Sequence, residues 1–256
     1  MTIAVSERDR DEAVIAEVTG GSPEIRERKR SQAIAEIPRW YNPWVHLGLT
    51  TAVGIAVWVL GVLRLHAITW RDWITVPIVL VASNAFEWRA HRDLLHRRTK
   101  PFQVLYDRHT PLHHMVYTYD DMAIRSTREL RLVLIPAVGV AGVVLGTAPA
   151  AIGVSLLFGS NAGWLMLMTS AFYVVAYEWS HMSYHLPPDS LVGRQWIVRL
   201  LREHHARHHH PRLMQRWNFN VTIPFWDWVK GTIAKGETLV GAGISPPSGR
   251  ASDESR

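Results

Sequence analysis

Histidine is the residue type in this chain with the most obvious capacity for chemistry. It occurs 14 times among 256 residues, most often in four short clusters. The ten that we take as candidate metal ligands are His91, His96, His109, His113, His114, His181, His185, His205, His208 and His209. Neutral imidazole binds zinc, iron, copper and nickel, and a single zinc site needs only three or four ligands. Ten candidate ligands therefore predict a pair of metal ions.

The spacing within the two early clusters leaves their geometry open. His91 and His96 are five residues apart, which is about 140° around an ideal helix. They would therefore serve different metal ions, or the helix would need a local distortion. His109 and His113 can share one helical face, whereas His114 points about 100° away from it.

The two later clusters fit regular helices. His181 and His185 are four residues apart, so both imidazoles can lie on one face. In the last cluster, an apolar stripe formed by Trp196, Ile197, Leu200 and Leu201 continues into His204, His205, His208 and His209. We expect the helical face that packs into the core to present imidazoles one turn later.

Other residues near the clusters have two possible roles. His204 and His210 are ambiguous, whereas His46 and His66 at membrane edges are typical interfacial residues. Four carboxylates could orient imidazole N–H groups or could be ordinary helix-surface charges: Glu87, Asp93, Glu178 and Glu203.

The composition excludes several other kinds of site. The chain has no cysteine, which excludes disulfides, thiolate-ligated haem, iron–sulfur clusters and cysteine zinc sites. The net charge of +6 could suggest nucleic acid. However, no aromatic and basic RNA-binding motif is present, and the basic residues flank apolar runs, so we expect no nucleic-acid partner.

Long apolar runs predict the elements that position the histidines. The 24 residues between Arg39 and Arg64 carry no charge and suffice for one transmembrane helix. A shorter run covers residues 73–86. Residues 132–177 give 46 uncharged positions, enough for two spans with a turn near residues 146–149 or 159–161. The sequence thus predicts about four transmembrane helices.

The basic residues predict the orientation of these spans. Of the 28 lysines and arginines, only Arg64 and Arg71 would lie on one side of a four-span protein. The positive-inside rule makes the other side cytoplasmic, and all four histidine clusters lie there. We expect an all-α, integral multi-pass membrane bundle with a cytosolic histidine-rich helical cap.

The chain divides into three predicted regions. Residues 1–38 form a polar N-terminal tail, in which Ser22, Pro23 and Glu24 could cap a short basic helix that runs through Ala35. Residues 39–236 form the catalytic membrane domain. Residues 237–256 form a tail, rich in Gly, Ser and Pro from about Gly241, that we expect to be disordered.

From about Asn84 to Thr232 the chain resembles the fatty acid hydroxylase / sterol desaturase superfamily, the membrane histidine-box oxygenases. The resemblance rests on the ordered pattern His-x4-His, His-x3-His-His, His-x3-His and His-x2-His-His, formed by the ten histidines. It also rests on residues 117–122 (YTYDDM), residues 177–179 (YEW) and the closing segment 218–227 (NFNVTIPFWD) followed by Gly231-Thr232. Asn220 departs from the pattern, because the family commonly has glycine there.

The resemblance implies two iron ions held by the ten histidines, with dioxygen as co-substrate and no further catalytic residue beyond the ligands. Zinc can replace iron in a structure of such a protein. The expected substrate is a lipid from the bilayer, either a fatty acyl chain, a sterol or another isoprenoid, which is hydroxylated or desaturated. No fused haem domain precedes the predicted spans, so we expect a separate electron donor: a reductase, a ferredoxin or a cytochrome.

Two other interpretations fit the histidine clusters. A dizinc membrane hydrolase would use the same kind of ligands, and iron content and oxygen-dependent turnover would distinguish it. A metal transporter or sensor would place polar or charged ligands inside the spans, yet the 46-residue run has no charged residue.

Overall fold

The computed structural model describes residues 23–244, and within them the chain forms helices and no strand. The helices are α2 (Pro23–Ala35), α3 (Pro43–Arg64), α4 (Trp70–Trp73), α5 (Thr75–Ala90), η1 (His91–Leu95), α6 (Gln103–Arg108), η2 (His109–His113), α7 (His114–Val116), η3 (Thr127–Glu129), α8 (Leu130–Val133), α9 (Ala137–Phe158), α10 (Ser160–Tyr184), α11 (Trp196–His208), α12 (Phe225–Lys230) and α13 (Glu237–Ala242). The predicted all-α class is confirmed for this part of the chain.

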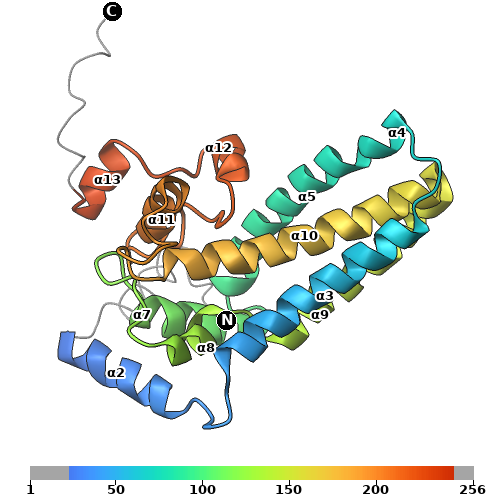
Figure 1. Cartoon of the computed structure of the whole chain (residues 1–256). Helices are drawn as coiled ribbons and strands as arrows, with labels where there is room; N and C mark the ends of the chain where they lie inside the picture. The colour runs from blue at the N-terminus through green and yellow to red at the C-terminus, as the bar shows by residue number, and fades with distance from the viewer. Residues whose placement is uncertain (1–22, 245–256) are drawn as a thin grey trace, which may run out of the picture.

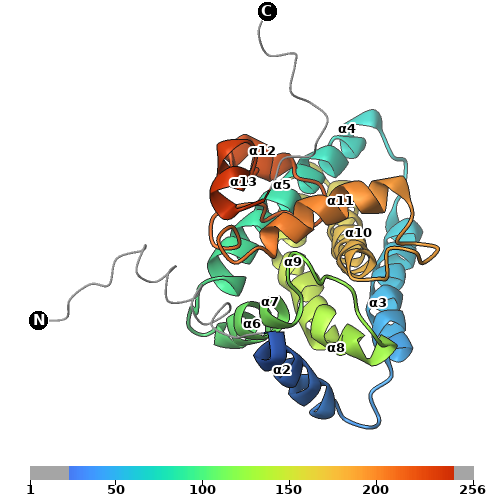
Figure 2. The same ribbon diagram turned by 90° about the vertical axis from the view of Figure 1, so that its left-hand side faces the viewer.

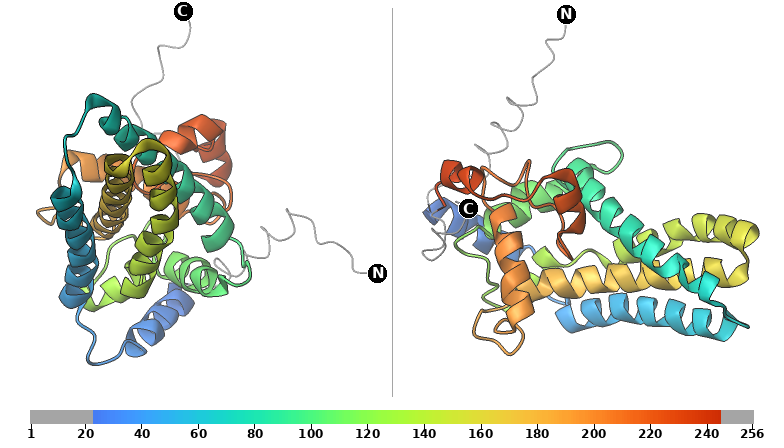
Figure 3. Two further views of the ribbon diagram at one scale, coloured as in Figure 1. Left: turned by 90° about the vertical axis from the view of Figure 1, so that its right-hand side faces the viewer. Right: turned by 90° about the horizontal axis from the view of Figure 1, so that it is seen from above.

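Four long helices form an elongated bundle. α3, α5, α9 and α10 run alongside one another, and α10 packs against the other three (Figure 1; Figure 3, right). The short helices gather as a cap at one end of this bundle, while α4 and the α9–α10 turn lie at the other end. Because α5 and α10 both run towards the cap, the histidine clusters that follow them arrive at the same end.

Two of the bundle helices could cross a membrane. α3 and α9 each have 22 residues and high hydropathy, and at 1.5 Å per residue each is about 33 Å long. This length matches a hydrocarbon core of about 30 Å. α5 and α10 do not combine this length with this hydropathy. Length and hydropathy therefore support two of the four predicted spans.

Local sequence signals explain where these long helices begin and end. The Asn42 side chain accepts hydrogen bonds from Trp44 N (2.9 Å) and Val45 N (3.2 Å), which caps α3. α9 ends at Gly159, whose φ of 96° is accessible to glycine at little cost. The turn therefore lies at the second of the two predicted positions, and Pro149 is accommodated inside α9.

The two polar ends differ in how well they match expectation. The predicted basic helix through Ala35 is confirmed as α2, and residues 1–22 lie outside the described residues. The region from 237 was expected to be disordered, but Glu237–Ala242 forms α13. The reason is apolar packing, since Leu239, Ala242 and Ile244 join a buried cluster with Leu213 and Ala234. Residues 245–256 lie outside the described part of the chain.

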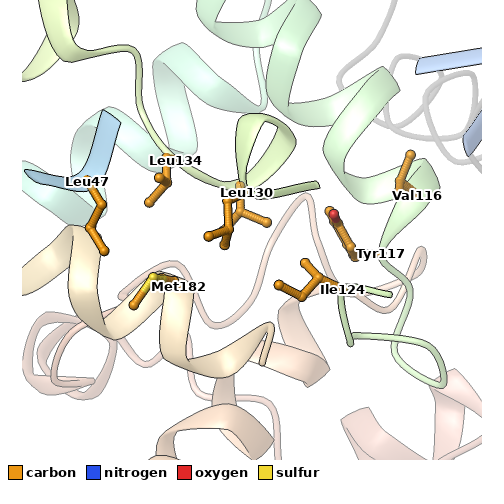
Figure 4. Packing of buried hydrophobic residues seen from close by; sticks show 8 residues of the cluster. Leu47, Val116, Tyr117, Ile124, Leu130, Leu134 and Met182 are labelled. Carbon is orange, nitrogen blue, oxygen red and sulfur yellow. The ribbon is translucent and has the colours of Figure 1, made fainter. Parts of the chain in front are cut away.

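A buried apolar cluster connects the bundle to the cap. It joins Leu47 of α3 and Met182 of α10 to residues from the intervening cap segment (Figure 4). The other members are Val116, Tyr117, Ile124, Leu130, Val133 and Leu134. This packing fixes the segment 116–134 against the ends of two bundle helices.

The apolar stripe of α11 does not pack into the protein core as expected. Trp196, Ile197 and Leu200 are 69%, 42% and 60% exposed. In Figure 2, which looks onto the cap, α11 lies across the end of α10. The stripe therefore continues into the buried histidines His205 and His208, while these three apolar side chains remain exposed in the described part of the chain.

Close packing of α9 against α10 provides a test of the bundle. A Cβ at Gly163 would lie 2.5 Å from the Ala151 backbone oxygen and 1.8 Å from Ser155 Oγ. We expect Gly163→Ala to separate the two helices and to destabilise the protein by about 1–3 kcal/mol. Gly142→Ala is the matched control, because nothing lies within 4 Å of the added Cβ. Thermal unfolding in detergent measures both; an equal melting temperature for the two variants would contradict this packing.

Candidate metal centre

The ten predicted histidines come together at the cap as two adjoining groups. Group A consists of His91, His96, His109, His114 and His208. Group B consists of His113, His181, His185, His205 and His209. In each group, one ring nitrogen from every residue lies within 4.8 Å of the others, and all ten side chains are buried. The rings of His114 and His209 stack at 4.2 Å, so the two groups are in contact.

Two π-helical turns assemble group A. η1 closes with His96 N donating to His91 O at 3.2 Å, and η2 closes with His114 N donating to His109 O. A π-turn adds one residue to the helical turn and so brings residues five apart onto one side. Of the two geometries that the spacing left open, the structure has the local distortion. The π-turn of η2 also assigns His109 and His113 to different groups. Their rings stack at 5.2 Å, but His109 belongs to group A and His113 to group B.

Regular helices supply most of group B. His181 and His185 come from the end of α10, and His205 and His209 come from α11 and its C-terminal end. Both pairs have the four-residue spacing that places imidazoles on one face. His208 faces the other way and joins group A. Thus α11 contributes to both groups, which places it between them.

Backbone carbonyls orient many of these imidazoles. Nδ1 lies at hydrogen-bond distance from a carbonyl oxygen in five cases: His91 to Phe219, His113 to Leu132, His185 to Met122, His208 to Trp217 and His209 to Tyr117. His96 Nδ1 similarly lies 3.2 Å from Thr110 Oγ1, whose hydroxyl donates to Leu95 O. Carbonyl oxygens only accept hydrogen bonds, so each Nδ1 must carry the proton. The Nε2 atom then offers a free lone pair to a metal ion.

Several of these lone pairs face other imidazole nitrogens or have no hydrogen-bond partner among the described residues. His96 Nε2 and His208 Nε2 lie 2.9 Å apart, although both rings carry their proton on Nδ1. His91 Nε2 and His109 Nε2 are equally close. In group B, His113 Nε2 and His185 Nε2 are buried without any hydrogen-bond partner among the described residues. A buried polar atom without a partner is costly, and a bound cation would satisfy these atoms. The residues present therefore fit metal ions.

Burial keeps the rings in the form that binds metal. Loss of solvent lowers the pKa of His91 to about 4, and the pKa values of His109 and His208 are also lowered, again mainly by burial. Neighbouring imidazoles lower the pKa of His109 and His208 further. At neutral pH these rings are uncharged and available as ligands.

The four carboxylates considered from the sequence do not orient the ligands. Glu87 and Glu178 are buried, but Glu87 accepts from the backbone of Thr222 (3.0 Å) and Glu178 from Ile135 N (3.1 Å). Asp93 pairs with Arg92, and Glu203 pairs with Arg207. Among the described residues, none of the four carboxylates hydrogen-bonds to one of the ten histidines, and their partners lie in the surrounding scaffold.

The remaining histidines lie outside both groups. His204 Nε2 lies 3.0 Å from Asp227 Oδ2, and the half-buried His210 contacts Tyr119. His46 bonds to Tyr41 and to Ile135 O, while the His66 backbone bonds to Asn161. None of the four joins a group of candidate ligands in the described residues.

The closing segment contains supporting residues whose roles the sequence did not show. Asp227 is fully buried and accepts hydrogen bonds from Phe219 N (3.0 Å), Asn220 N (2.7 Å) and Thr232 Oγ1 (2.6 Å). It thereby positions Phe219, whose carbonyl holds His91. The only signal in the sequence was the segment's likeness to the family ending.

Asn220, the departure from the family pattern, fits its surroundings. Its side chain donates to Asn84 O (3.0 Å) and accepts from Asp227 N (2.9 Å). The left-handed backbone in this segment occurs instead at Asn218, with φ of 59°, a conformation that asparagine tolerates better than most residues. The turn therefore does not need glycine at position 220.

Comparison with known protein families finds one family whose profile matches the part of the chain that contains both histidine groups. The profile of the fatty acid hydroxylase family matches residues 76–232, which is more than half of the chain. The chain belongs to the fatty acid hydroxylase family. The match includes all ten histidines and ends at Thr232, the partner of Asp227. α2 and α3 precede it. Neither a curated protein nor a solved structure matches the chain significantly.

Loss of single histidines tests the two groups. We expect His208→Ala to reduce metal bound at group A and His205→Ala to reduce metal bound at group B, because each removes one of five converging nitrogens. The control is His210→Ala. His210 follows His209 in the sequence but lies outside both groups, so this variant should retain the full metal content. Metal per chain is measured by elemental mass spectrometry of purified protein. Equal metal loss in all three variants would contradict the assignment.

Substitution of Asp227 tests whether the closing segment positions the ligands of group A. Asp227→Asn replaces one acceptor oxygen by an NH2 group, so Phe219 and His91 should lose their fixed positions. We expect metal affinity to fall about 10–100-fold, as is typical for residues that orient ligands. Glu237→Gln, at an exposed position of α13, provides the matched control. Metal titration measures both variants, and unchanged affinity in Asp227→Asn would rule out this support.

Proposed function

We propose that this protein is a membrane oxygenase in which the two histidine groups each hold an iron ion and act on a lipid. The observation that carries the proposal is the convergence of ten buried imidazoles into two adjoining groups. Membership of the fatty acid hydroxylase family supports hydroxylation as the reaction class. The ten histidines are the proposed ligands, and no other catalytic residue is proposed.

The donor set supports this metal chemistry. Two adjacent ions can act together on one small molecule, and contact between the groups through His114 and His209 makes such a pair geometrically reasonable. When bound, two iron ions would activate dioxygen for the oxidation of an unactivated carbon–hydrogen bond, with electrons supplied by the separate donor. Zinc would bind the same nitrogens without redox activity.

The protein's own contribution is orientation and exclusion of water. Nδ1 hydrogen bonds to backbone carbonyls fix the tautomers of several ligands, so their Nε2 atoms remain aimed at the ions. All ten imidazoles are buried, with the largest exposed fraction being 7% at His109. A dry site limits side reactions of reactive oxygen species with solvent.

The substrate is proposed to come from the bilayer. α3 and α9 are long and apolar enough to cross it, and α5 and α10 are proposed to complete four spans. Exposed apolar side chains on cap helices, such as Trp196, Leu200 and Trp228, suit the interfacial region beside the spans. A fatty acyl chain, a sterol or another isoprenoid could reach the site from there.

The cap is proposed to lie on the cytoplasmic side, where a separate reductase, ferredoxin or cytochrome would deliver electrons. The distribution of lysine and arginine supports this orientation, because only Arg64 and Arg71 would lie on the opposite side. Accessibility of these two positions to a membrane-impermeant label after substitution by cysteine would test it.

Oxygen labelling tests the proposed reaction. Lipids from cells that express the protein in an atmosphere of 18O2 are compared with those from cells that express His113→Ala, and purified protein is analysed for metal. We expect two iron ions per chain and a lipid that contains one 18O atom, or that has lost two hydrogens if the outcome is desaturation. His113→Ala should give neither product.

Other outcomes would contradict the proposal. Two zinc ions, with lipid cleavage and oxygen derived from water, would identify a dizinc hydrolase. Metal flux into vesicles without any change in lipids would identify a transporter.

A further inference from the structure

We propose that the N-terminal helix α2 positions the ligands of group B, and that Arg30 is the positioning residue. This inference rests on the proposed function, because it assigns a metal ion to group B. α2 covers Pro23–Ala35 and lies outside the family match, which begins at residue 76. The family pattern therefore gives no role to this helix.

Arg30 is the buried contact between α2 and the cap. Its side chain is 3% exposed, and Nη2 lies 2.5 Å from Glu129 Oε2 and 3.0 Å from Ala123 O. Nη1 lies 3.3 Å from Asp121 Oδ2, and the guanidinium lies over the Tyr117 ring at 5.5 Å. One side chain thus contacts the segment 117–129 at four points.

This segment carries two of the carbonyls that orient group B. Tyr117 O accepts from His209 Nδ1, and Met122 O accepts from His185 Nδ1, both at 2.7 Å. The Tyr117 ring also lies 4.7 Å from the His185 ring. Group A is held by other segments, since His91 and His208 donate to Phe219 and Trp217. A displacement of residues 117–122 should therefore affect group B more than group A.

Glu129 connects Arg30 to this segment. The same carboxylate accepts from Tyr117 Oη (3.3 Å) and, through Oε1, from the backbone N atoms of Arg125 and Ser126 (both 3.1 Å). It is 1% exposed, so bulk solvent does not reach it while Arg30 is in place. Removing one member of a buried ion pair leaves the other charge uncompensated, which is strongly unfavourable.

Two further polar links near α2 are less buried than Arg30. Glu27 pairs with Arg125 at 2.6 Å, but both side chains are about half exposed. Arg128 Nη2 donates to Ile37 O at 2.9 Å just after α2. Exposed ion pairs contribute little to stability, so the buried Arg30 side chain is the stronger polar contact.

Metal content of the full-length holoprotein tests the proposal. We expect Arg30→Gln to lower the affinity of group B for its metal ion about 10–100-fold, while group A keeps its ion. The control Arg28→Gln removes the same charge from an exposed position on the same helix and should keep both ions. Arg30→Lys keeps the charge but not the forked geometry, so it should fall between the two. Equal metal content in Arg30→Gln and Arg28→Gln would overturn the proposal.

A second measurement does not depend on metal. Hydrogen–deuterium exchange of the metal-free, full-length protein reports the backbone of residues 117–129 directly. We expect faster exchange there in Arg30→Gln than in Arg28→Gln, with exchange in residues 217–222 unchanged. Equal exchange in the two variants would overturn the role of Arg30, even if no metal binds. If wild-type protein binds no metal but exchange changes as expected, the proposed function fails and the contact made by α2 stands.

Thermal unfolding separates positioning from general stability. If Arg30→Gln does not fold, Arg30→Lys is used for both measurements. Loss of metal from group B at a temperature well below the onset of unfolding supports a positioning role. Loss of both ions together at the unfolding transition would instead show a purely structural role and overturn the proposal.

Discussion

Ten neutral imidazoles in one buried region are the constraint on which this structure depends. Five of them direct their Nδ1 protons at backbone carbonyls. The Nε2 atoms of these five rings face other imidazoles or have no hydrogen-bond partner among the described residues. Such an arrangement is unfavourable without a cation, because buried acceptors without partners lose the hydrogen bonds of water. The geometry of the cap is therefore understandable as the geometry of a metal-bound protein.

The rest of the fold serves to bring these rings together. α5 and α10 deliver one cluster each to the cap end of the bundle, and two π-turns adjust the early clusters. The closing segment then returns to the site, where Asp227 holds Phe219 and Phe219 holds His91. Hydrogen bonds to backbone far away in the sequence, 128 positions for His91 and 92 for His209, thus fix several of the rings.

The sequence was sufficient to predict the ligand candidates and the helical class, because histidine spacing and apolar runs are local signals. Local signals also indicated α2, and they gave Gly159 as one of two possible positions for the turn. They failed at η1 and η2, where tertiary contacts select a π-turn that the sequence leaves open. They also failed for α13, which is packed rather than disordered, and for the apolar stripe of α11, which is exposed rather than buried. The periodicity of a segment does not show which other segments will cover its apolar face. The sequence suggests carboxylates as partners of the imidazole N–H groups, whereas backbone carbonyls accept five of these hydrogen bonds. Which backbone oxygens lie near a ring depends on the complete fold.

The most direct test of this account is to locate the metals in the purified protein by anomalous diffraction at the iron absorption edge. We expect two anomalous peaks per chain, one among the Nε2 atoms near His96 and His208 and one among the nitrogens near His113 and His185. A single peak, peaks at other positions, or a metal-free site with its imidazoles turned towards solvent would contradict it.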